Sequence, residues 1–137
     1  MGLCLFVFGP PEGDDDPTEI AECDIGHYSD FNYFREAVSR HLDADRFPVL
    51  LEHSDCEGEW TLFELPTLER ELKEIADAFQ ALPPEEPESA FEHTAEYREN
   101  AKSLYDSFHN PSGENLLKAM LQLCAVAMTH RLPITFM

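Results

Sequence analysis

Apolar side chains recur three and four positions apart in two stretches of this chain, which predicts two amphipathic helices. The first stretch follows Ser29 and Asp30, either of which can cap a helix, and the second starts beside Pro66 and stops before a Pro-Pro pair. The two stripes consist of Phe31, Phe34, Val38 and Leu42, and of Leu65, Leu68, Leu72, Ile75, Phe79 and Leu82. Residues 116–128 are apolar almost all round, so we expect a third helix there, at the centre of the fold.

Short apolar runs predict strands between and beside these helices. Residues 3–8 are almost continuously apolar, which predicts a strand buried on both faces. Residues 47–51 predict a second strand, and residues 134–136 predict a last one. Two further stretches are less regular: residues 25–28 predict a short extended piece, and residues 103–108 fit either a strand or a loop.

The order of these elements fits an α+β or α/β fold, and we expect α+β, with three main helices packed on a small sheet of about three to five strands. At 137 residues the chain has the length of one domain, so we expect a single domain over residues 1–137. Residues 12–24 contain seven carboxylates and no basic residue, and we expect them to form an acidic loop.

Charge narrows the choice of partner. The chain has 28 acidic and 9 basic residues, a net charge of −19, and eight acids precede the first base, Arg35. Nucleic acid and anionic membrane are bound by clustered Lys and Arg, so neither is the expected partner. A strong negative field speeds the encounter with a cationic protein, although high charge also serves solubility alone. We therefore expect a basic protein partner.

The cysteines and the first residues bear on the location of the protein. The short apolar start lacks the basic region and cleavage site of a signal peptide, and no stretch is long enough to span a bilayer. The four cysteines match no zinc-finger spacing; they are Cys4, Cys23, Cys56 and Cys124. We therefore expect reduced thiols in the cytoplasm, and no cofactor.

Residues 52–64 read EHSDCEGEWTLFE and hold five carboxylates, no Lys or Arg, and the only tryptophan of the chain. An indole among acids and small polar groups suits an exposed binding face, with packing in the core as the alternative. Carboxylates here would pair with Lys or Arg of a partner. The candidate partner-binding residues are His53, Asp55, Glu57, Glu59 and Trp60, with Asp14, Asp15 and Asp16 adding electrostatic steering.

The same segment permits a different reading, as a small enzyme. His53, Asp55 and Cys56 are all residue types that bind zinc, and Cys23 or Asp24 can complete such a site. Cys56 and His53 can also form a nucleophile and base pair, although the chain has no elbow motif of the G-x-S-x-G type. The simpler alternative is a turn in which Asp55 caps backbone amides before Gly58. A metal- or thiol-dependent enzyme is therefore the rival to a binding protein.

Four segments together resemble a known pattern: MGLCLFVF; GHYSDFNYFREAV; RFPVLLEHSDCEGEW with the helix that follows it; and SLYDSFHNPSGENLLKAMLQLC with the final LPITFM. The pattern resembles a family of bacterial polymorphic-toxin immunity proteins, and HSDCEGEW is its most specific piece. The resemblance implies a non-catalytic protein that binds and blocks a toxin encoded beside it, often a nuclease or another basic enzyme. It also implies four motif positions, which either contact the toxin or build the fold: His53, Asp55, Gly58 and Trp60.

Overall fold

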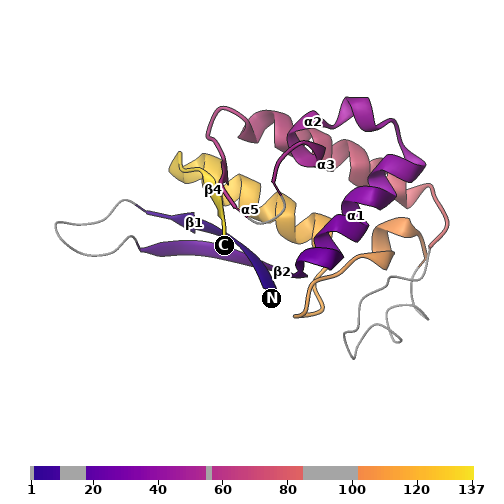
Figure 1. Cartoon of the computed structure of the whole chain (residues 1–137), viewed down its shortest axis with the longest axis horizontal. Coiled ribbons are helices and arrows are strands. Elements are labelled where there is room, and N and C mark those ends of the chain that lie inside the picture. Colours follow the sequence, from indigo (N-terminus) through magenta and orange to yellow (C-terminus); the bar gives the residue numbers. More distant parts are fainter. Residues whose placement is uncertain (1, 10–17, 55–56, 85–101) are drawn as a thin grey trace.

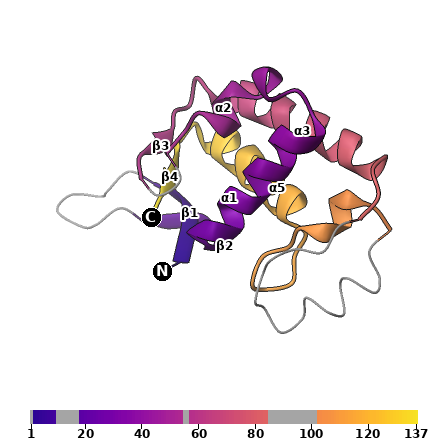
Figure 2. The same ribbon diagram turned by 45° about the vertical axis from the view of Figure 1, so that its right-hand side comes forward.

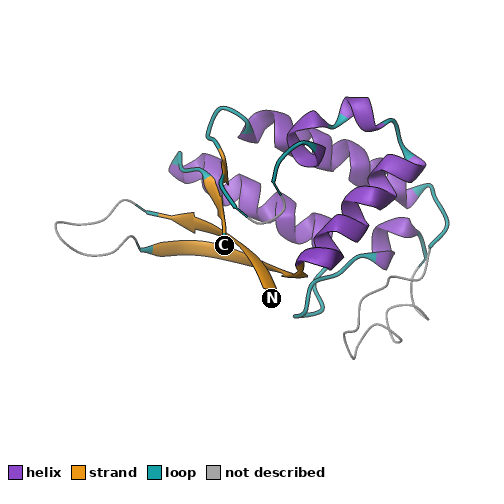
Figure 3. Cartoon of the chain, in the orientation of Figure 1, coloured by secondary structure: helices purple, strands orange, loops and turns teal. Residues whose placement is uncertain are grey.

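A computed structural model describes residues 2–9, 18–54, 57–84 and 102–137 of the chain. Within these ranges the fold is α+β: four strands form one antiparallel sheet, and three main helices lie on one side of it (Figures 1 and 3). The strands are β1 (Gly2–Phe8), β2 (Glu19–His27), β3 (Glu59–Trp60) and β4 (Ile134–Phe136), in the spatial order β2-β1-β4-β3. The helices are α1 (Tyr28–His41), α2 (Pro48–Leu51), α3 (Leu65–Gln80) and α5 (Leu116–His130). Of the main helices, α1 and α5 lie against the strands, and α3 lies against α5. The predicted α+β class is confirmed.

The strand β1 is buried on one face only, and the expectation of burial on both faces is wrong. The alternate residues Leu3, Leu5 and Val7 are fully buried, whereas Phe6 and Phe8, which alternate with them, are half-buried. The reason is visible in Figures 2 and 3, where the helices gather on one side of the sheet. No second layer of described residues covers the other face of β1. Burial between two layers therefore does not explain why both faces of this strand are apolar.

The strand β2 is longer than the sequence suggested. It takes up residues 19–24, which we expected to be loop, because Ala21 and Cys23 face the core while the acids between them face away. This period-two pattern is typical of a half-buried strand. β2 is an edge strand, since it pairs only with β1.

The two amphipathic helices and the apolar helix occur where predicted. α5 packs between α3 and the sheet, so the expectation that it lies at the centre is confirmed. α1 begins at Tyr28, with Asp30 accepting a hydrogen bond from the His27 backbone N–H at 2.9 Å. None of the described helices is both long and apolar enough to cross a membrane.

Residues 48–51 form the helix α2, with Phe47 as its N-cap, so the strand predicted over residues 47–51 is wrong. Pro48 occupies the first turn, where its missing N–H has no intrahelical acceptor to lose. The carboxylate of Glu71 on α3 accepts the N–H groups of Val49 and Leu50, at 3.3 and 3.0 Å. A tertiary acceptor therefore supports a helix of only four residues. Residues 104–107, expected as strand or loop, form a 3-10 helix (Leu104–Ser107).

Candidate functional site

Trp60 lies in the core, and the expectation of an exposed indole is wrong. Its side chain is 1% exposed, and its Nε1–H donates to the Val49 carbonyl at 3.0 Å. The cause is the pairing of β3 with β4, which places Trp60 opposite Ile134 on the buried face of the sheet. A ring this buried cannot anchor a partner while the fold stays closed.

The His53 side chain supports the backbone at Ser54 and Glu59. Its ring stacks on Phe136 with centroids 4.2 Å apart, and its ring nitrogens lie 2.8 Å from the Ser54 carbonyl and 2.9 Å from the Glu59 carbonyl. Carbonyl oxygens only accept, so the imidazolium satisfies both contacts and the neutral ring satisfies one. Arg35 donates to the His53 carbonyl at 2.8 Å. Because both ring nitrogens face backbone oxygens, neither is directed at a metal in this conformation.

Gly58 turns the chain between His53 and β3. Its φ of +87° is a conformation that glycine adopts without strain. Its carbonyl accepts the backbone N–H of Phe136 at 2.9 Å, which ties the turn to β4. The residues on either side, Glu57 and Glu59, are exposed. The segment therefore exposes two carboxylates, while Trp60 beside them is packed in the core.

Five of the candidate residues lie outside the described part of the chain; they are Asp14, Asp15, Asp16, Asp55 and Cys56. Their roles in binding, and the part of Asp55 and Cys56 in the enzyme alternative, stay predictions. Among the residues that the structure does describe, no three His, Cys, Asp or Glu side chains gather as a metal site would need.

The described thiols are poorly suited to chemistry. Burial raises the pKa of Cys23 to about 12, with the charge of Glu114 adding to the effect. Burial likewise raises the pKa of Cys124 to about 12, and it raises that of Cys4. A thiol must ionise to attack or to bind a metal, so all three are weak nucleophiles and ligands at neutral pH.

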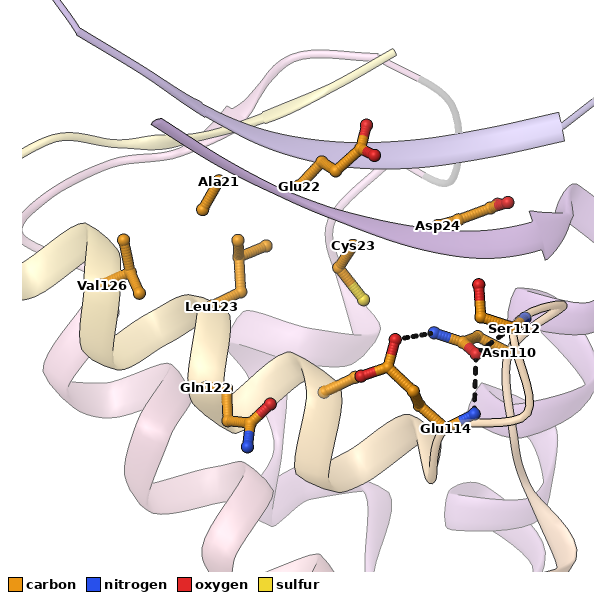
Figure 4. Close-up of a pocket in the computed structure, with 11 residues that line it drawn as sticks. Ala21, Glu22, Cys23, Asp24, Asn110, Ser112, Glu114, Gln122, Leu123 and Val126 are labelled. Carbon is orange, nitrogen blue, oxygen red and sulfur yellow. Dashed lines mark hydrogen bonds between the residues drawn. The ribbon is translucent and has the colours of Figure 1, made fainter. Parts of the chain in front are cut away.

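A second acidic feature, which we call the acidic pocket, lies between β2, α5 and the loop 110–114 (Figure 4). Its volume is about 180 Å³. Its lining, drawn from the described residues, includes the acidic residues Glu22, Asp24 and Glu114 and contains no Lys or Arg, but the Glu22 carboxylate points away from α5 (Figure 4). In Figure 4 the Cys23 sulfur points toward the helix side of β2. The Glu114 carboxylate gives the pocket a negative charge that can pair with a Lys or Arg side chain.

The loop beside the acidic pocket is organised by Asn110, which is 2% exposed. Its side-chain oxygen accepts the backbone N–H groups of Ser112 and Glu114, at 3.1 and 3.0 Å. Its amide nitrogen donates to the Glu114 carboxylate at 3.4 Å, as Figure 4 shows. These bonds fix the position of Glu114 at the mouth of the pocket.

Sequence reasoning missed Glu22, Asp24 and Glu114 as partner-binding candidates, and it considered Asp24 only as a zinc ligand. The alternation of acids with Ala21 and Cys23 was the available signal for the first two, because it marks a strand rather than a loop. Glu114 had no such signal, since only the fold brings the loop 110–114 against β2.

Comparison with known proteins adds a family to this geometry. A family model described as Immunity protein 70 matches residues 16–136. The matched residues include the segment around His53 and Trp60 and all of the acidic pocket, and β1 precedes them. No curated protein and no solved structure matches the chain.

Proposed function

Because this chain belongs to the Immunity protein 70 family, we propose that it protects a cell by binding a cognate toxin and blocking it, with no catalysis of its own. The resemblance to the immunity proteins of polymorphic toxin systems is confirmed by the family match. The toxin-neutralising role follows from the family, whereas the chemistry of the interface is argued below from charge and exposure.

The partner surface that we propose is basic. Glu57 and Glu59 are exposed, and neither forms an ion pair with a described Lys or Arg. A carboxylate loses solvation when an interface covers it, and a charge-assisted bond to Lys or Arg offsets that loss. A basic toxin surface can supply such bonds, whereas an acidic one would be repelled. Asp55 and the run Asp14, Asp15 and Asp16 belong to the same proposal through their charge.

The acidic pocket extends this proposal to a single side chain. The Glu114 carboxylate and the apolar side chains of α5 beside about 180 Å³ of space favour a cation with a slender apolar stem, which describes Lys and Arg. We propose that one basic side chain of the toxin enters here. Held by Asn110, the Glu114 carboxylate is already in place, so less side-chain entropy is lost on binding.

Inhibition would follow from occlusion. A toxin that acts on a polyanion needs Lys or Arg near its active site, and an acidic protein bound there excludes the substrate by bulk and by charge. We propose that binding takes place in the cytoplasm, before the toxin reaches its target.

The experiment uses the toxin domain encoded beside this gene, produced in a catalytically inactive form. The purified immunity protein should bind it, and co-expression should rescue cells from the active toxin. Glu57→Lys should weaken binding, whereas Asp77→Lys, an equal charge change at an exposed position of α3, should not. Absence of both binding and rescue by the wild-type protein would refute the proposed function.

A further inference from the structure

One face of the sheet is covered by no element among the described residues. The helices lie against the other face, on which Leu3, Leu5 and Val7 are fully buried (Figures 1 and 2). The uncovered side, which we call the open face, carries the remaining side chains of β1. These are Cys4, Phe6 and Phe8, and all three are half-buried.

The strand register shows what surrounds them. Residues directly opposite each other in antiparallel strands point to the same face. Phe6 is opposite Glu22 on one side and Thr135 on the other, and Thr135 is opposite Glu59. A single row across the open face therefore reads Glu22, Phe6, Thr135, Glu59.

The next row of the open face, which contains Cys4, also has an acidic residue on β2 beside an uncharged residue of β1. Cys4 is opposite Asp24 on β2, and it exchanges backbone hydrogen bonds of 3.0 and 2.9 Å with Met137, which is 59% exposed. The Phe6 and Phe8 rings stack with centroids 5.1 Å apart and planes 15° apart. The open face thus has an apolar, aromatic centre with carboxylates at its two edges, the usual anatomy of a protein interface.

The Asp, Glu, Lys and Arg side chains of the four described strands are all acidic. The four strands contain four carboxylates and no Lys or Arg. These carboxylates are Glu19, Glu22, Asp24 and Glu59. After burial, the charges of Asp24 and Glu22 are the next causes that raise the pKa of the Cys4 thiol, as expected where negative charge is not balanced. An apolar patch with this edge fits a partner whose own apolar patch is flanked by Lys or Arg.

We propose that the open face is the surface that contacts the cognate toxin, with Phe6 at its centre and Glu22 and Glu59 paired with basic side chains at its two edges. This inference rests on the proposed function and names the surface that performs it. A second copy of this chain is a poorer occupant, because two open faces would bring acidic edges together in a protein with a net charge of −19.

The test measures the affinity of four variants for the inactive toxin domain encoded beside this gene. Glu22→Lys and Glu59→Lys reverse exposed charges at the two edges, and Phe6→Ala removes the central ring. Glu36→Lys, at an exposed position of α1, is the matched control. Thermal unfolding and sedimentation of each protein accompany the binding data, so that misfolding and self-association are detected separately.

We expect each charge reversal on the open face to weaken binding by about tenfold or more, and Phe6→Ala to do the same. The control should bind like the wild-type protein. Equal affinities for Glu22→Lys, Glu59→Lys and Glu36→Lys would overturn the inference while leaving the proposed function intact. A dimer of the free protein that Phe6→Ala dissociates would also overturn it, by assigning the face to a second copy. A wild-type protein that fails to bind would refute the proposed function itself.

Discussion

At the scale of single residues, the described members of the HSDC-x-G-x-W segment, which are His53, Gly58 and Trp60, contribute to the packing of the fold. Trp60 packs edge-on against Phe136, with ring centroids 4.7 Å apart, and lies 5.4 Å from the His53 ring. Gly58 and the His53 ring nitrogens hold the backbone between them. The positions of the Glu57 and Glu59 carboxylates therefore depend on the packing of these aromatic rings.

Trp60→Ala should therefore lower the free energy of unfolding by about 3–5 kcal/mol, the usual cost of removing a large buried aromatic side chain. The reason is the lost packing on Phe136 and the unpaired Val49 carbonyl. Denaturant unfolding followed by circular dichroism measures the change, since the variant has no tryptophan. Phe63→Ala is the control, because Phe63 is 91% exposed and should change stability by roughly 0.5 kcal/mol or less. A Trp60→Ala protein with unchanged stability and lost toxin binding would show that the indole is an interface residue after all.

A second residue-scale prediction concerns Cys56, which lies outside the described residues. If the protein acts by binding, Cys56→Ser should keep protection against the toxin within a few-fold and cost about 1 kcal/mol of stability where the thiol is buried. Survival of cells that express the active toxin, at matched levels of each variant, measures this. Complete loss of protection by a well-folded Cys56→Ser protein would instead favour the metal- or thiol-dependent enzyme.

The burial of Trp60 could not be predicted from the sequence alone. Acids surround Trp60 in the sequence, yet strand alternation sends Glu59 outward and Trp60 inward. The partner of the indole N–H is Val49, which the helix α2 brings within reach. Neither the pairing with β4 nor this carbonyl can be read from the segment itself, so the exposure of the ring was not predictable.

At the scale of elements, the link between α2 and α3 rests on one buried acid. Glu71 is fully buried, and its carboxylate accepts the two N–H groups at the start of α2. The first N–H groups of any helix lack intrahelical acceptors, so this contact supplies what α2 cannot supply itself. Arg46, two residues before the start of α2, forms a second link by pairing with the Glu74 carboxylate of α3.

Glu71 should also make stability depend on pH. Burial raises its pKa above the ordinary value of 4.5, against the lowering effect of the two backbone hydrogen bonds. The folded state then holds the proton more tightly than the unfolded state. The contribution of Glu71 to stability is therefore complete below about pH 4.5 and is lost as pH rises through the folded pKa.

Urea unfolding of the wild type and of Glu71→Gln, measured from pH 4 upward in roughly one-unit steps, tests this sign. The wild-type protein should lose stability relative to Glu71→Gln as pH rises, because the glutamine does not titrate. Glu71→Ala should cost roughly 1–3 kcal/mol near pH 4, since it leaves two N–H groups without their acceptor, and less as pH rises, because alanine does not titrate either. A constant difference between the wild type and Glu71→Gln across the range would count against a raised pKa.

The elements differ in how well the sequence predicts them, for a physical reason. α1, α3 and α5 are long enough for their apolar periodicity to be unmistakable, and all three were predicted. α2 has four residues, and an apolar run of that length fits strand or helix equally until a tertiary contact such as Glu71 decides. β2 was hidden because its acids suggested a loop, although acids on an open sheet face are compatible with a strand.

At the scale of the whole molecule, the two sides of the fold carry charge differently. On the helical side, acids are partly balanced, as by Lys73, which lies 3.3 Å from Glu69 on α3. The strands contain no Lys or Arg. With a net charge of −19, the field is strong, and the sheet side contributes negative charge without local compensation. Such a field acts on a basic toxin before any contact forms.

Association with the toxin should therefore slow clearly as salt rises from low to physiological concentration. Exposed charges are screened over about 10 Å at ~0.1 M salt, so steering weakens while the contacts of the bound state are affected less. Stopped-flow or surface-based kinetics with the inactive toxin domain give the association rate at each salt concentration. The double variant Glu22→Gln with Glu59→Gln keeps the shape of the open face and removes two of its charges, so its association rate should depend less steeply on salt. An association rate that does not change with salt would show that the acidic surface does not guide the encounter, and the charge would then serve solubility alone.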